Sequence, residues 1–256
     1  MIRLFFAAAR FQVLQMRRSP GDLLVLVTLP LLSVAFLSIL VESGDRDLAP
    51  YAVVGTAVMS IWSIAVFISG GIIDTERRGG TLEAIVPTPA ALSVIVVGRI
   101  MTVTVISLLG LPESILVAWA AFGIRIQVVH PAVFLLTLAC TTIAVVGTAT
   151  VMAGLFVLSR SAQTYQNSLT YPFYVLSGAV VPITYLPGWL QPVSKAVFLS
   201  WTSELLRASL LTAQPSRVPF QLAVILLLGV GAFGTGLLMI NRVLNRLRRQ
   251  GTVGQV

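Results

Sequence analysis

Long apolar runs dominate the chain, and charged or turn-forming residues separate one run from the next. Six of these runs are long enough for a transmembrane helix, which needs roughly 20 predominantly apolar residues. They cover approximately residues 23–41, 51–73, 92–122, 133–158, 164–181 and 220–240. The pattern predicts an all-α integral membrane protein with six transmembrane helices, organised as one transmembrane domain over residues 1–256.

Residues 1–18 have a different pattern, that of an amphipathic helix. Apolar side chains at helical spacing share one arc, and arginines seven residues apart share the opposite arc: Phe5, Phe6, Ala9, Val13 and Met16 against Arg3, Arg10 and Arg17. A basic amphipathic helix of this kind lies in the membrane interface. A signal peptide is the alternative, but no small-x-small cleavage site follows the first apolar run. We therefore expect an interfacial helix.

The segment 182–219, between the fifth and sixth runs, is irregular. Pro187 and Pro192 interrupt it, and Trp189 and Trp201 suit a membrane interface. Charged side chains oppose a full crossing of the bilayer: Lys195, Glu204 and Arg207. We expect a re-entrant segment of short helices that dip into the outer interface.

Composition and charge support a membrane protein. The chain is 57% hydrophobic and 10% charged, whereas a soluble domain carries roughly 25% charged residues. The net charge of +8 does not indicate nucleic-acid binding, because the basic residues lie at the ends of apolar runs. With the N-terminus in the cytoplasm, 12 of the 17 lysines and arginines are cytoplasmic, as the positive-inside rule requires. Six spans then place both termini in the cytoplasm.

The sequence offers no nucleotide, metal or hydrolase site. A Walker A loop needs a lysine, and the single lysine, Lys195, follows no glycine-rich loop. Cys140 and His130 each stand alone, so neither an intrachain disulfide nor a metal-ligand spacing is present. We expect no cofactor on this chain, and any ATP-driven step would take place on a partner.

The stretch 74–89 carries the densest mixture of charges between two apolar runs. Gly79 and Gly80 permit a sharp reversal, and Thr81 can cap a short helix that ends before Pro87. That helix would carry Leu82, Glu83 and Ile85. On physical grounds alone, a helix that docks on a cytoplasmic partner and a solvated loop are equally compatible with the pattern.

Two sequence elements resemble type-2 ABC exporter permeases. Residues 76–83 read Glu-Arg-Arg-Gly-Gly-Thr-Leu-Glu and precede Pro-Thr-Pro, which is similar to the E-x-x-x-G-T-L-E segment of that family. Residues 176–190 are similar to its SG-x-x-x-P … LP-x-W-L element. The family includes daunorubicin-resistance-type drug exporters and the polysaccharide and teichoic-acid exporters. The importer signature E-A-A-x-x-x-G is absent.

The resemblance implies a function and a set of partners. The loop after the second span would be the coupling helix that sits on a separate ABC ATPase subunit, which binds ATP and Mg²⁺. The residues given this role are Glu76, Arg77, Arg78, Thr81, Leu82 and Glu83. The interfacial helix, with Arg10, Arg17 and Arg18, would be a second contact. A second permease, identical or related, would complete an exporter in the bacterial inner membrane. Its substrate would be an amphiphilic drug, a lipid-linked molecule or a glycan.

Polar residues recur along one face of the predicted fifth helix. They are Gln163, Gln166, Asn167, Thr170, Tyr174 and Ser177. Polar residues inside a membrane are candidates for function, so this face is a candidate substrate pathway. The alternative is packing, because hydrogen bonds of such residues also hold transmembrane helices together.

Two other classes of membrane protein are also compatible with the sequence. A secondary carrier driven by an ion gradient would need an ion site in the membrane, and Glu113 is the only carboxylate at mid-span. A membrane protein that assembles or signals without transport is the third possibility.

Overall fold

The computed structural model describes residues 2–19, 31, 33–39, 41–42, 49–78, 92–157, 162–213 and 215–250. Within these residues the fold is all-helical and contains no strand, which confirms the all-α part of the predicted fold class. The helices are α1 (Ile2–Arg18), α3 (Ala49–Arg78), α5 (Leu92–Ser107), α6 (Gly110–Phe122), α7 (Pro131–Val157), α8 (Ala162–Leu176), the 3₁₀ helix η2 (Ile183–Tyr185), α9 (Leu190–Lys195), α10 (Phe198–Leu210) and α11 (Val218–Gln250).

Four segments of the described chain are long and apolar enough to cross a membrane. They are Ala49–Ile68, Ser93–Phe122, Pro131–Leu155 and Val218–Arg242. These segments coincide with the predicted second, third, fourth and sixth spans. The predicted first span lies largely outside the described residues, so the count of six stays a prediction.

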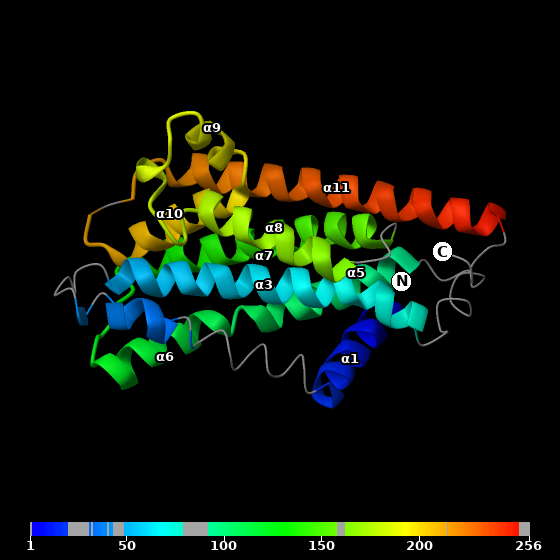
Figure 1. Cartoon of the computed structure of the whole chain (residues 1–256), viewed down its shortest axis with the longest axis horizontal. Coiled ribbons are helices and arrows are strands. Elements are labelled where there is room, and N and C mark those ends of the chain that lie inside the picture. Colours follow the sequence, from blue (N-terminus) through cyan, green and yellow to red (C-terminus); the bar gives the residue numbers. More distant parts are fainter. Residues whose placement is uncertain are drawn as a thin grey trace.

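The long helices run side by side along the long axis of the molecule, and α1 crosses one end at a steep angle (Figure 1). The start of α1 and the end of α11 lie at this end, whereas α9 and α10 lie at the opposite end (Figure 1). We call these the terminal end and the α10 end. An even number of crossings places both chain ends on one side, and the orientation of that side in the membrane stays a prediction.

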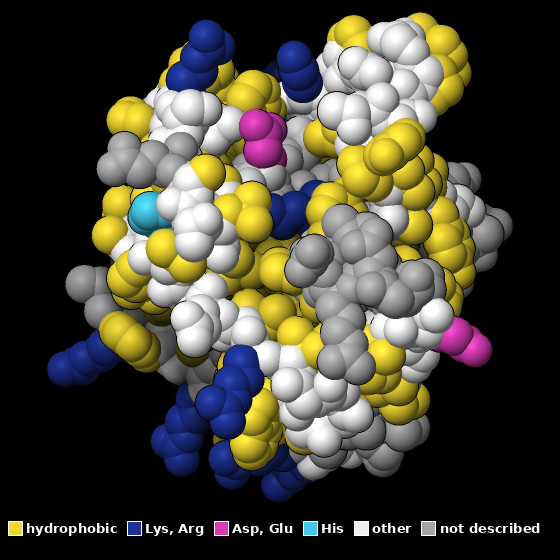
Figure 2. All heavy atoms as spheres, turned by 90° about the vertical axis from the view of Figure 1, so that its left-hand side faces the viewer, with side chains coloured by type: hydrophobic (Ala, Val, Ile, Leu, Met, Phe, Trp, Pro, Cys, Tyr) yellow, Lys and Arg dark blue, Asp and Glu magenta, His cyan; other side chains and the backbone are white. Residues whose placement is uncertain are grey.

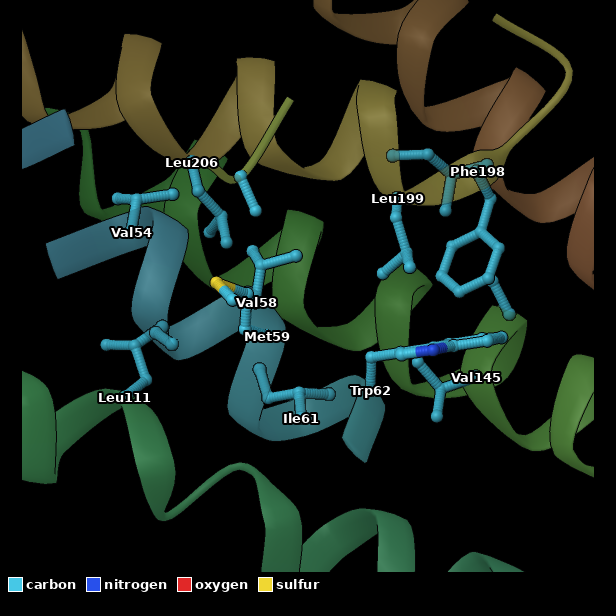
Figure 3. Packing of buried hydrophobic residues seen from close by; sticks show 14 of the residues in the cluster. Val54, Val58, Met59, Ile61, Trp62, Leu111, Val145, Phe198, Leu199 and Leu206 are labelled. Atoms are coloured by element: carbon cyan, nitrogen blue, oxygen red, sulfur yellow. The ribbon is translucent and has the colours of Figure 1, made fainter. Parts of the chain in front are cut away.

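Helix α3 forms the centre of the bundle. Of its most apolar stretch 89% is buried, against 22% for the peripheral α11, as expected for a helix that is apolar all round. The ring of Trp62 stacks on Phe173 of α8 at a centroid distance of 4.4 Å and tilts against Phe198 of α10. Figure 3 shows Trp62 beneath Phe198, with Val145 of α7 beside it. This cluster joins α7, α8 and α10 to α3.

Helices α7 and α11 pack closely because both present glycines at their contact. A Cβ on Gly229 would lie 2.5 Å from the Cα of Ala144, and one on Gly147 would overlap the backbone of Gly229. Gly231 and Gly234 face open space instead. Small residues allow this close approach within membranes, so Gly147 and Gly229 bring the two helices together, whereas Gly231 and Gly234 take no part in the contact.

The predicted third span is not one continuous helix. It divides into α5 and α6, with a turn at Leu108 and Leu109. Pro112 has no N–H to donate to Leu108, and the amide of Leu111 instead donates to the Leu108 carbonyl at 3.1 Å, which tightens the chain. The third span is therefore present at its predicted place, Ser93–Phe122, and it contains a turn that the hydropathy pattern did not predict.

The predicted fifth span also ends earlier than expected. Helix α8 has 15 residues and stops at Leu176 rather than Val181, because Gly178 adopts a left-handed conformation with φ of 68°. Beyond it, residues 183–210 form η2, α9 and α10, the longest of which has 13 residues. None of the three is long enough to cross a bilayer, so the prediction of short helices here is confirmed.

Candidate functional site

The charged stretch after the second span begins inside α3. Glu76, Arg77 and Arg78 form the last turn of this helix, so the first part of the stretch continues the second span. Thr81, Leu82 and Glu83 lie outside the described residues. The docking role of this stretch stays a prediction, but its two anchors are known. The chain leaves α3 at Arg78 and re-enters the bundle at the start of α5.

A buried arginine fixes α1 to α5 at the terminal end. The side chain of Arg99 is only 1% exposed. Its Nε donates to Gln12 Oε1 at 2.7 Å and its Nη2 donates to Gln15 Oε1 at 2.6 Å. The guanidinium also lies 5.2 Å from the centre of the Phe11 ring. Charged groups are rarely buried unless they are hydrogen-bonded, so these contacts make α1 and α5 one unit.

The orientation of α1 differs from the prediction by about one position. The face packed against the bundle carries Ala8, Gln12 and Met16, whereas the predicted apolar arc centred on Ala9 and Val13. Arg99 explains the difference, because its hydrogen bonds draw a polar residue into the centre of the buried face. The three arginines proposed as a partner contact are all exposed: Arg10, Arg17 and Arg18.

The polar face of α8 looks into the bundle where it is described. Gln166, Thr170 and Ser177 are buried, and the hydroxyl of Tyr174 is hydrogen-bonded to that of Ser63 on α3. The side chains of Gln163 and Asn167 lie outside the described set. The hydroxyls of Thr170 and Ser177 donate to carbonyls of their own helix, at 2.7 and 2.9 Å. The face thus contacts α3, and its role as a pathway stays a prediction.

Three side chains hold the chain where α8 ends, at the α10 end. Ser203 Oγ donates to the Ser177 carbonyl at 2.5 Å, and Tyr51 Oη donates to the Gly178 carbonyl at 2.8 Å. Arg207 Nη2 donates to the same Gly178 carbonyl at 2.9 Å. Because Tyr51 belongs to α3 and the other two donors belong to α10, the end of α8 is tied to both helices.

Close contact with α3 reinforces this connection. A Cβ on Gly55 of α3 would overlap the Ala179 carbonyl oxygen, so only glycine allows the chain to pass here. The sequence pattern did not predict the contact of Arg207 with Tyr51 or with Gly178. The one available indication was the charge of Arg207 in the irregular segment 182–219.

The described residues hold no group of three His, Cys, Asp or Glu side chains that could bind a metal ion. Glu113 lies half-buried in the first turn of α6. No second carboxylate, imidazole or thiol joins it in such a group within the described part of the chain. The arrangement around Glu113 therefore adds no support for a carrier driven by an ion gradient.

Comparison with known proteins gives one positive finding. A family model described as ABC-2 type transporter matches residues 3–211 of the chain, from α1 to the end of α10. A search of curated proteins returns no match.

Proposed function

Because the chain belongs to the ABC-2 type transporter family and is a transmembrane permease of that family, we propose that it is the membrane subunit of an ATP-driven exporter. Permeases of this family typically have no ATPase activity of their own, and the family implies a partner ABC ATPase subunit. In the proposed complex that partner binds ATP and Mg²⁺, and a second permease, identical or related, completes the transport unit.

The continuity of α3 is the observation that supports this proposal. Its 30 residues run without a break from Ala49 to Arg78, which is about 45 Å at 1.5 Å per residue. One end carries Glu76, Arg77 and Arg78, and the other end holds the Gly178 carbonyl through Tyr51. A helix packed on all sides moves as a rigid body. A push at the charged end is therefore transmitted to the α10 end.

The terminal end supplies a second route for the same movement. The proposed coupling loop joins α3 to α5, and Arg99 fixes α1 to α5. ATP binding would close the two ATPase subunits, shift the loop residues Thr81, Leu82 and Glu83, and carry α1, α3 and α5 with them. In this proposal the exposed Arg10, Arg17 and Arg18 of α1 contact the ATPase or acidic headgroups of the membrane.

The direction and the substrate follow from the resemblance and from the apolar interior. The chain would export an amphiphilic molecule, such as a drug, a lipid-linked compound or a glycan carrier, with both termini in the cytoplasm and the α10 end outside. The polar face of α8 is the proposed pathway: Gln163, Gln166, Asn167, Thr170, Tyr174 and Ser177. The hydrogen bond between Tyr174 and Ser63 would then open when the substrate passes.

A charge reversal at Glu83 tests the proposal. Glu83→Arg should lower ATPase activity stimulated by substrate at least tenfold in the reconstituted complex, because it removes a charge-assisted contact of about 1.5–3 kcal/mol. Glu42→Arg is the matched control, since Glu42 is exposed on the other side of the proposed membrane. Membrane insertion should be equal for both variants. Normal coupled transport by the Glu83→Arg protein would refute the coupling role.

A further inference from the structure

A pocket at the α10 end has the composition of a ligand site. Its volume is about 560 Å³, and it lies between the start of α3, η2, α9 and α10. Figure 2 shows this end of the molecule, hollowed near its middle, with Lys or Arg atoms inside the hollow. Its walls include the apolar residues Pro182, Ile183, Ala208 and Leu211. We call this cavity the Arg207 pocket.

The charge of Arg207 is incompletely balanced. Its Nη2 donates to the carbonyls of Gly178 and Ala179, and its guanidinium lies 3.4 Å from the centre of the Tyr51 ring. Its buried Nε has no hydrogen-bond partner among the described residues, and no carboxylate of those residues forms an ion pair with it. Burial lowers the pKa of Arg207 to about 10, against the effect of Tyr51, so the side chain stays positively charged at neutral pH.

The other polar groups of the pocket favour an anion. Lys195 is a second cation on its wall, and Thr184 and Ser200 add hydroxyl groups. Glu204 is the one carboxylate among the lining residues, and its oxygen accepts a hydrogen bond from Gln221 Nε2 at 3.0 Å. Two cations against one hydrogen-bonded carboxylate leave a site with net positive charge, and a partly buried cation without a paired counter-ion is costly.

We propose that the Arg207 pocket binds the anionic headgroup of an amphiphile, with a phosphate or carboxylate beside Arg207 and Lys195. Such a group would provide the missing acceptor for Nε and would form charge-assisted hydrogen bonds. Ile183 and Leu211 would contact the apolar part of the molecule. The inference goes beyond the proposed export function, because it concerns binding by this chain alone.

The test measures binding to the full chain in nanodiscs of phosphatidylcholine, without nucleotide or ATPase. Dodecyl phosphate is the probe and dodecyl maltoside is its neutral counterpart. The fluorescence of Trp201, which lines the pocket, reports binding, and the Trp201→Phe variant should lose the signal. Dodecyl phosphate should bind at least tenfold more tightly than dodecyl maltoside, as charge-assisted hydrogen bonds predict.

Two pairs of variants separate the pocket from the general charge of the surface. Arg207→Gln should weaken dodecyl phosphate at least about tenfold, and Arg207→Lys should weaken it less. Lys195→Glu should abolish the preference for the anion, whereas Arg125→Glu should not change it. Lys195 and Arg125 are both exposed, so these two variants should fold normally. Unchanged binding by the Lys195→Glu protein would overturn the proposal even if Arg207→Gln failed to fold.

A change of lipid identifies the source of the headgroup. If the natural ligand is an anionic lipid, nanodiscs with phosphatidylglycerol should compete with dodecyl phosphate and weaken its apparent affinity severalfold. If the ligand is a free anionic amphiphile, the affinity should not change. Either result supports an anion site, and equal binding of the phosphate and the maltoside would overturn it. Because no ATPase is present, that failure would leave the permease proposal intact.

Discussion

Two arginines at opposite ends of the bundle, Arg99 buried and Arg207 half-buried, differ in how their charges are balanced. Arg99, at the terminal end, donates to two glutamine side-chain oxygens and is 1% exposed. Arg207, at the α10 end, relies on backbone carbonyls and an aromatic ring, and its Nε has no partner among the described residues. Beside Arg99 the cavity is only about 70 Å³, against about 560 Å³ beside Arg207.

The comparison separates a structural charge from a charge available to a ligand. A buried cation whose donors meet matching acceptors in a small space holds helices together. A half-buried cation that has a buried, unmatched donor beside a large cavity gains stability when an anion binds. Arg99 thus belongs to the proposed coupling unit of α1 and α5, and Arg207 to a binding pocket.

The largest expected effect is the loss of stability when the structural charge of Arg99 is removed. Arg99→Leu should destabilise the fold by about 3 kcal/mol, because two charge-assisted hydrogen bonds of about 1.5–3 kcal/mol each are lost and the glutamine oxygens lose their donors. Unfolding in a denaturing detergent series measures the change. Trypsin should also cleave α1 faster at Arg10 and Arg17. Arg242→Leu is the control, because Arg242 is exposed, and equal stability of both variants would contradict the role of Arg99.

Substitution of two glycines, one near each arginine, should show that the α10 end and the terminal end differ in how tightly they are packed. Gly55→Ala should cost about 1–3 kcal/mol, since the new Cβ would overlap the Ala179 carbonyl next to Arg207. Gly98→Ala, beside Arg99, should cost less, because the nearest atoms of Phe5 and Ala8 lie 3.2–3.3 Å from the new Cβ and need to move only a few tenths of an ångström. Both are read from the same unfolding series. A larger loss of stability for Gly98→Ala than for Gly55→Ala would mean that the α10 end accommodates a new side chain more easily than the close contact at Gly55 implies.

Several membrane-spanning helices could be predicted from the sequence, and the features that could not be predicted have a physical reason. Hydropathy and the positive-inside pattern predicted α3, α7 and α11, because the span of a helix depends on its own residues alone. The break at Leu108 and Leu109 was missed, although Pro112 gave a signal, because a proline in a membrane helix can be accommodated without a break.

The contacts of Arg99 and Arg207 could not be predicted from the sequence. The contact between Arg99 and Gln12 joins residues 87 positions apart, and that between Arg207 and Gly178 joins residues 29 positions apart. Neither pairing has a periodic signature, so the rotation of α1 and the Arg207 pocket emerge only from the tertiary arrangement. The polar face of α8 was predicted as a pattern, and the contact of Tyr174 with Ser63 was not.

The smallest expected effect concerns a single hydroxyl near Arg207. Ser203→Ala removes the donor to the Ser177 carbonyl and should cost about 1 kcal/mol in the same unfolding series. Ser216→Ala should have no measurable effect, because Ser216 is exposed. Anion binding should survive the Ser203 change, since Arg207 and Lys195 remain. Loss of dodecyl phosphate binding in this variant would indicate that the pocket depends on the end of α8 more than on its charges.

The central claim is that α3 transmits movement from the coupling end to the α10 end, and a distance measurement in the assembled transporter tests it most directly. Spin labels can be placed at Thr184→Cys and Leu211→Cys, in a Cys140→Ala background, because both residues are exposed and both line the Arg207 pocket. A non-hydrolysable ATP analogue bound to the partner ATPase should shift the distance between the labels, and Glu83→Arg should abolish that shift. An unchanged distance in the wild-type complex, while transport continues, would contradict the account.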